Sequence, residues 1–172
     1  MPYFYVLMTL TMRFIPHPWN MTPMAAMFLY SGTAFKSRLP SILFPLASLI
    51  ISDIAVTELL YGRHYNITLG LASLLAFTVI GMLGWSMRRS FTWGRLIVVS
   101  VISSVLFFVI TNFAEWMQGH LYPLTSAGLM QCYLAGIPYF LNSLAGDLLY
   151  ALTLFGAHQL FLNPVRQDFL MK

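Results

Sequence analysis

Six apolar segments, separated by short polar connections, determine what this chain can fold into. Four of them are about 20 residues or longer, which is the length that a transmembrane helix needs. Hydrophobic residues make up 59% of the chain and charged residues 8%, whereas a soluble domain carries roughly a quarter charged residues. The sequence therefore predicts an all-α integral membrane bundle of six transmembrane helices in a single domain, residues 1–172. The predicted helices are residues 3–15, 21–35, 40–61, 67–87, 93–117 and 137–162.

The first two apolar segments are too short to cross a bilayer. At 1.5 Å per residue they cover about 20–24 Å, less than the roughly 30 Å of a hydrocarbon core. The connection at residues 16–20 is therefore expected below the membrane surface, where irregular backbone is tolerated if it is buried in protein or lines a wet cavity. Residues 125–136 are predicted to be a second connection of this kind, because they are too short to span and too apolar for an open loop. We expect both connections to act as lids or floor of a cavity.

The Lys and Arg residues are distributed unequally between the two ends of the predicted helices. Seven lie in the even-numbered connections and the C-terminal tail, and two lie in the odd-numbered connections. By the positive-inside rule, this bias places both termini in the cytoplasm, as in a multi-pass protein of the bacterial inner membrane. The N-terminus lacks a basic region and a cleavage site, so we expect a retained helix rather than a signal peptide. The seven are Lys36, Arg38, Arg88, Arg89, Arg95, Arg166 and Lys172, and the two are Arg13 and Arg63.

A polar cluster follows the apolar run of residues 96–110. It begins at Thr111 and contains an amide, a carboxylate, an indole, an imidazole and a phenol within about three helical turns. Polar side chains inside a membrane are costly unless protein or water surrounds them, so such a cluster indicates a functional site. In the predicted topology, four of the five acidic residues and three of the four histidines lie at or outside the membrane midplane. The sequence thus predicts a polar funnel that is open to the outer side and closed to the inner side.

The predicted site combines polar side chains with aromatic walls, which suits a small amphipathic molecule. Alternatives stay open for several of its residues. Asp53 and Asp147 could form a structural pair, Arg13 could extend to the lipid headgroups, and Trp116 could belong to an aromatic belt. The candidate polar contacts are Arg13, His17, Asn20, Asp53, Asn112, Glu115, Asn142 and Asp147, and the candidate stacking residues are Trp19, Trp116, Tyr122 and Tyr139.

Signatures of other functions are missing from the sequence. There is no G-x-S-x-G, no H-E-x-x-H and no glycine-rich phosphate loop, so we predict neither an enzyme nor a cofactor. The outer histidines lack metal-ligand spacing, Cys132 has no partner for an internal disulfide, and the scattered basic residues do not predict nucleic acid as a partner. Two alternatives remain. The chain could be an accessory subunit of a larger membrane complex, with His158 or the outer histidines as haem ligands. It could also be a membrane enzyme that uses Asp53 and Asp147 as acid and base on a lipid-soluble substrate.

Several motifs of the chain resemble those of a known protein family. They are Arg13-Phe14-Ile15-Pro16-His17-Pro18-Trp19-Asn20, Ser52-Asp53, Thr111-Asn112-Phe113, Tyr122-Pro123, Ile137-Pro138-Tyr139-Phe140-x-Asn142 and Gly146-Asp147-Leu148-Leu149-Tyr150. The pattern resembles an uncharacterised family of small six-helix bacterial membrane proteins, itself similar in layout to the substrate-binding S components of energy-coupling factor vitamin transporters. The resemblance implies a pocket near the outer face that captures a vitamin-like micronutrient, and a transmembrane coupling protein with two ATPases as partner. Residues 3–15 depart from the S components, because they contain no alanine where those proteins carry an Ala-x-x-x-Ala docking pattern.

Overall fold

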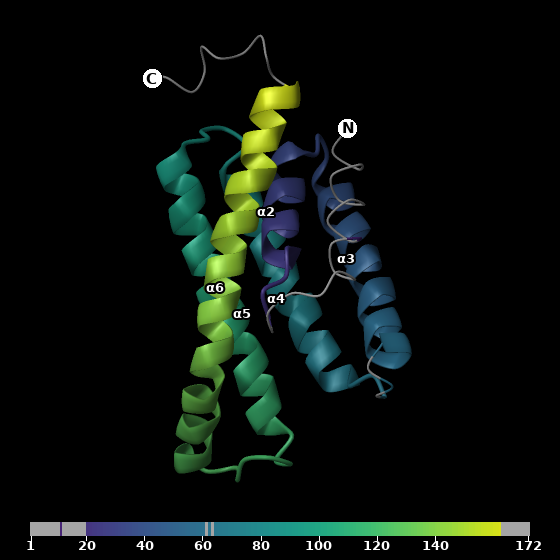
Figure 1. Cartoon of the computed structure of the whole chain (residues 1–172), viewed down its shortest axis with the longest axis vertical. Coiled ribbons are helices and arrows are strands. Elements are labelled where there is room, and N and C mark those ends of the chain that lie inside the picture. The colour runs from purple at the N-terminus through teal and green to yellow at the C-terminus, as the bar shows by residue number, and fades with distance from the viewer. Residues whose placement is uncertain (1–10, 12–19, 61, 63, 163–172) are drawn as a thin grey trace.

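The computed structural model describes residues 11, 20–60, 62 and 64–162 of the chain. These residues form five α-helices and one π-helical segment, with no strand among them. The all-α prediction is therefore confirmed for this part of the chain. The helices are α2 (Met24–Ala34), α3 (Arg38–Ala55), η1 (Val56–Leu60), α4 (Ile67–Ser86), α5 (Trp93–Met117) and α6 (Ser126–Leu162), as Figure 1 shows.

Four helical spans are long and apolar enough to cross a membrane, which makes this a helical membrane protein. They are Arg38–Leu59, Ile67–Ser86, Trp93–Met117 and Ser126–Leu160, with mean hydropathies of 1.9, 2.1, 2.4 and 1.3. The prediction of six spanning helices is not met by the described residues, because α2 has only 11 residues. It covers about 16 Å, roughly half of a hydrocarbon core. The first predicted segment, residues 3–15, lies almost entirely outside the described residues.

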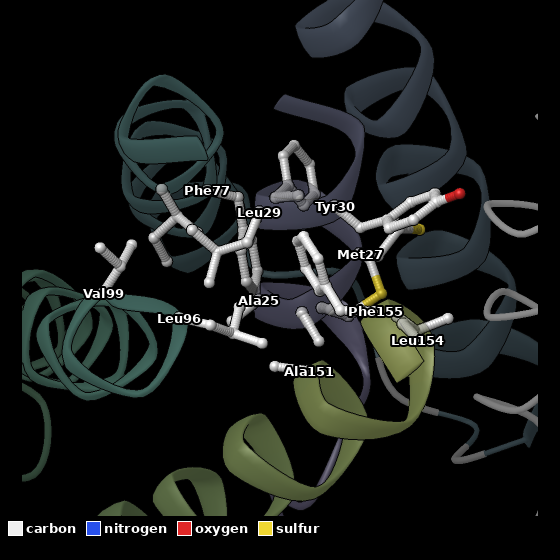
Figure 2. Close-up of a cluster of buried hydrophobic side chains, with 14 of the residues drawn as sticks. Ala25, Met27, Leu29, Tyr30, Phe77, Leu96, Val99, Ala151, Leu154 and Phe155 are labelled. Carbon is white, nitrogen blue, oxygen red and sulfur yellow. The ribbon is translucent and has the colours of Figure 1, made fainter. Parts of the chain in front are cut away.

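The short helix α2 lies at the centre of the bundle. Every residue from Met24 to Gly32 is buried, as expected of a helix that is apolar on all sides. Figure 2 shows side chains of α4, α5 and α6 converging on it, among them Phe77, Leu96 and Phe155. Helix α4 approaches α2 most closely where glycines meet, since a Cβ on Gly32 would overlap the carbonyl oxygen of Gly81. Small residues at such a crossing let two backbones pack in direct contact.

Helix α6 corrects one prediction. Residues 125–136, expected as a lid or floor, form its first turns, so the helix begins at Ser126 and not at residue 137. Thr125 supplies the start, because its Oγ1 accepts a hydrogen bond from the Gly128 amide at 3.1 Å, as an N-cap residue does. Pro138, beside which the predicted boundary was drawn, lies inside the helix. Within membrane helices a proline is tolerated where neighbouring helices and local adjustments satisfy the freed backbone groups.

Consecutive helices run antiparallel, so their connections alternate between two ends of the bundle (Figure 1). The α2–α3 and α4–α5 connections meet at one end, and the connection from α5 to α6 lies at the other. All the lysines and arginines that the structure describes lie at the first end, namely Lys36, Arg38, Arg88, Arg89 and Arg95. We call it the basic end. Five of the nine cations in the chain are described, and all five lie at the end where the expected charge bias puts them together.

Candidate functional site

A cavity of about 160 Å³ opens where α2 begins. Its walls come from the turn before α2 and from α2, α3, α4, α5 and α6. Ser73, Phe107 and Asp147 lie about 20 Å along their helices from the basic end, at 1.5 Å per residue. The cavity therefore lies deep inside the bundle, displaced away from the basic end. Its lining residues are Asn20, Thr22, Met24, Ala25, Leu49, Asp53, Ser73, Phe77, Phe107, Ser143 and Asp147.

The start of α2 explains why there is a polar cavity at this depth. Pro23 stands at the N-cap position, and no side chain of the described residues caps the first turn. The first amide groups of a helix have no partner within the helix, and the dipole makes this end partially positive. Asn20, just before the helix, has a φ of 62°. Asparagine tolerates this left-handed backbone conformation better than most residues do. The backbone carbonyl of Asn20 accepts a hydrogen bond from Ser143 Oγ at 3.2 Å, which ties this turn to α6.

Asp147 is the most deeply buried acidic side chain among the described residues, with 6% of its surface exposed. Its Oδ2 accepts a hydrogen bond from Ser104 Oγ on α5 at 2.6 Å. The same hydroxyl lies 3.1 Å from the carbonyl oxygen of Ser100. Asp53 lines the cavity from α3 and is partly buried. Three residues further on, at Val56, the helix widens into the π-helical segment η1, and such segments are frequent at functional sites.

A second cavity, of about 180 Å³, lies farther from the basic end. Asn112, Glu115 and Tyr139, three of the predicted site residues, line it. The side-chain amide of Asn112 donates to the Phe108 carbonyl at 2.8 Å, so its oxygen is directed toward α6, where a Cβ on Gly136 would overlap it. The two cavities share a wall made of Asn20, Phe107 and Ser143.

The remaining predicted site residues lie elsewhere. Trp116 and Tyr122 belong to the end of α5 and the connection after it, where Trp116 Nε1 donates to the Pro123 carbonyl at 3.0 Å. Neither side chain lines either cavity, and Asn142 on α6 does not line them either. Arg13, His17 and Trp19 are outside the described residues. Of the twelve candidates, the structure thus gathers six around the two cavities, namely Asn20, Asp53, Asn112, Glu115, Tyr139 and Asp147.

Sequence reasoning missed the small hydroxyl residues of the cavity walls. Thr22, Ser73 and Ser143 line the first cavity, and Ser143 lines the second as well. A signal was present on α5, where Ser100 and Ser104 are one turn apart and both fully buried. That spacing is typical of helix packing in membranes, and only the fold shows that Ser104 also contacts a carboxylate.

Among the described residues, the histidines considered as haem or metal ligands do not form such a site. His158 Nδ1 lies 2.7 Å from the Tyr30 hydroxyl, on the half of α6 nearer the basic end. Its ring also packs edge-on against Tyr30, with centroids 5.5 Å apart. In the part of the chain that the structure covers, no three His, Cys, Asp or Glu side chains are grouped to hold a metal ion.

The fold and the cavities define a class: a helical membrane protein whose short central helix, buried from Met24 to Gly32, begins at a polar cavity within the bundle. The chain belongs to the DUF6580 family, described as a family of unknown function, whose model matches residues 1–168. Neither a curated protein nor a solved structure matches the chain.

Proposed function

We propose that this protein binds a small organic molecule in the cavity at the start of α2, and that it serves as the substrate-binding or transport subunit of a nutrient uptake system. One observation carries the proposal: a polar cavity lies where α2 begins partway through the bundle, at a first turn that no side chain of the described residues caps. Many secondary transporters bind substrates at the ends of such discontinuous helices, where free amide groups and side chains converge at membrane depth.

The size of the two cavities limits what can bind. Small-molecule pockets have volumes of about 300–1,000 Å³. The cavities measure about 160 Å³ and about 180 Å³, so each alone accommodates only a small molecule. A vitamin-sized ligand would occupy both, which requires Phe107 or the Asn20–Ser143 contact in the shared wall to move. The cavities would then act as an outer vestibule and a deeper compartment of one site.

The orientation of the site follows from the charges. With the basic end in the cytoplasm, the second cavity lies on the outer side, as uptake from outside the cell requires. The proposal includes residues 3–15 as a further membrane helix, both termini in the cytoplasm of a bacterium, and S-component-like capture of a vitamin-like micronutrient. A transmembrane coupling protein with ATPases is its proposed energy source.

The test is co-purification followed by binding measurements. Protein purified from cells grown on rich medium is expected to carry a small molecule that mass spectrometry identifies. Asp147→Asn, which alters a cavity wall, is expected to weaken binding of that molecule at least tenfold. Glu58→Gln is the matched control, because Glu58 is exposed on η1 and lines neither cavity. Repeated absence of any ligand, together with no binding across a vitamin panel, would contradict the proposal.

The same preparation separates the two rival functions. A cofactor-carrying subunit would show a visible absorption spectrum after purification. An enzyme would lose turnover in the Asp147→Asn variant while its substrate affinity stayed unchanged, since removal of an acid or base affects the chemical step.

A further inference from the structure

We infer that the basic end holds a specific site for the phosphate group of an anionic phospholipid, formed by Lys36, Arg38 and Arg88 beside the indole of Trp85. The site is separate from the cavities and does not depend on the proposed function. Its residues come from the α2–α3 connection, the start of α3, the end of α4 and the α4–α5 connection.

Arg88, in the α4–α5 connection, is hydrogen-bonded to the end of α2 and to the α2–α3 connection. Its Nε donates to the Gly32 carbonyl at 2.6 Å, and Nη1 donates to the Lys36 carbonyl at 3.4 Å. Nη2 lies 3.3 Å from Ser41 Oγ. Lys36 is therefore held next to Arg88 through its backbone, and its exposed side chain extends from the same connection.

Arg38 is fixed in place by a cation–π contact. Its guanidinium carbon lies 5.2 Å from the centroid of the Trp85 ring. The indole is itself anchored, because Trp85 Nε1 donates to Ser41 Oγ at 3.0 Å. Ser41 thus anchors the Arg88 guanidinium directly and the Arg38 guanidinium through the Trp85 indole.

The structure describes no acidic side chain beside the cluster. The described acidic residues, Asp53, Glu58, Glu115 and Asp147, all lie away from this end, and none of Lys36, Arg38 and Arg88 is ion-paired within the described residues. Partial burial, and secondarily the positive charge of Arg38, lower the pKa of Arg88. Two like charges held close together favour an anion between them, and guanidinium groups bind phosphate with particular geometric fit.

The position of the cluster identifies the anion as a lipid. Arg38 begins a helix long and apolar enough to span the membrane, and two leucines of its first turns, Leu39 and Leu43, are 68% and 53% exposed. They lie one turn apart on the lipid-facing surface, where an acyl chain below a bound phosphate would pack. Anionic lipids attract basic groups of the cytoplasmic leaflet with a gain of about fivefold in affinity for each Lys or Arg near the surface.

Fluorescence quenching of Trp85 tests the site. A variant that keeps Trp85 as its sole tryptophan, made by Trp19→Phe, Trp93→Phe and Trp116→Phe, is reconstituted into phosphatidylcholine vesicles with a small fraction of brominated lipid. Brominated phosphatidylglycerol is expected to quench Trp85 at a severalfold lower fraction than brominated phosphatidylcholine does. Arg38→Gln is expected to reduce this preference about fivefold, and Arg89→Gln, an exposed cation outside the cluster, is expected to leave it unchanged. If Arg38→Gln does not fold, Lys36→Gln takes its place with the same expectation.

Three outcomes would overturn the inference. The first is equal quenching of Trp85 by the two brominated lipids. The second is an equal phosphatidylglycerol preference in a protein whose sole tryptophan is Trp93, because it would reveal general surface attraction rather than a site. The third is loss of the preference on adding soluble glycerol 3-phosphate at millimolar concentration, which would show a site for free phosphate esters.

Discussion

The Nε atom of Arg88 donates a 2.6 Å hydrogen bond to the backbone carbonyl of Gly32, in the last turn of α2. A cation at this position complements the partially negative C-terminal end of a helix. The opposite end of the same helix begins at a cavity lined by Asp53 and Asp147. The short central helix thus has a positive group at its negative end and acidic groups near its positive end. This arrangement lets a helix that is buried from Met24 to Gly32 begin inside the bundle.

Removal of the Arg88 side chain is expected to destabilise the fold. Arg88→Gln loses a hydrogen bond from a charged group to a buried carbonyl, a contribution of about 1.5–3 kcal/mol. The control is Arg89→Gln at the neighbouring exposed position. Denaturant unfolding in detergent micelles measures both free energies of unfolding. Equal stability of the two variants would show that the Arg88–Gly32 contact does not hold the end of α2.

The glycine crossing between α2 and α4 is expected to tolerate no side chain. A Cβ on Gly32 would overlap the Gly81 carbonyl oxygen, and overpacking of this kind costs about 1–3 kcal/mol. We therefore expect Gly32→Ala to lower the melting temperature. Gly94→Ala is the control, because open space surrounds Gly94 and alanine favours a helix. A melting temperature for Gly32→Ala at or above that of the unmodified protein would contradict the close approach of the two helices.

The hydrogen bond between Ser104 and Asp147 is expected to contribute to stability. Ser104→Ala leaves a buried carboxyl group without its 2.6 Å partner, which costs about 1–3 kcal/mol. Ser103→Ala is a matched control, because Ser103 is equally buried but donates only to the Val99 carbonyl of its own helix at 2.8 Å. A double-mutant cycle with Asp147→Ala, which removes the acceptor, isolates the pair. A coupling free energy near zero would show that the contact is energetically neutral.

Two substitutions of Asn20 separate its effect on protein stability from its effect on ligand binding. Because its φ is 62°, Asn20→Ala is expected to cost about 1 kcal/mol, whereas Asn20→Gly keeps the left-handed conformation without strain. Both variants lack the side-chain amide. If that amide contacts the proposed ligand, both should bind it more weakly to a similar extent, although only Asn20→Ala lowers the melting temperature. Unchanged ligand affinity in Asn20→Gly would remove Asn20 from the binding site.

The bounds of the two helices that begin at a capping side chain, α4 and α5, were predicted closely from the sequence. The predicted segment 93–117 coincides with α5, and 67–87 exceeds α4 by one residue. Both helices begin after a capping side chain: Asn66 accepts from the Leu69 amide at 3.2 Å and Thr92 from the Arg95 amide at 3.1 Å. Such caps act within one turn and can be read from neighbouring residues. The π-helical segment η1 and the passage of α6 through Pro138 depend on packing between helices, so the same reasoning missed them.

The candidate site was predictable in part for a similar reason. Hydropathy and charge bias placed Asn112 and Glu115 in the outer half of the membrane and Asp147 near mid-depth, and depth is a one-dimensional property that residue counting estimates well. Which side of each helix these residues occupy depends on how the helices are rotated against one another. Trp116, at the same depth as Glu115, therefore contacts the α5–α6 connection and not a cavity.

The sequence by itself determined that the chain is a helical membrane protein, where α4 and α5 lie, and that the described cations gather at one end of the bundle. These properties follow from the free energy of transferring each side chain into lipid, which is summed along the chain. Only the tertiary structure decided that α2 is enclosed on all sides, that its first turn opens into a polar cavity, and that Ser104 meets Asp147 there. Those contacts join residues distant in sequence, and they depend on how glycine and serine surfaces of neighbouring helices fit together.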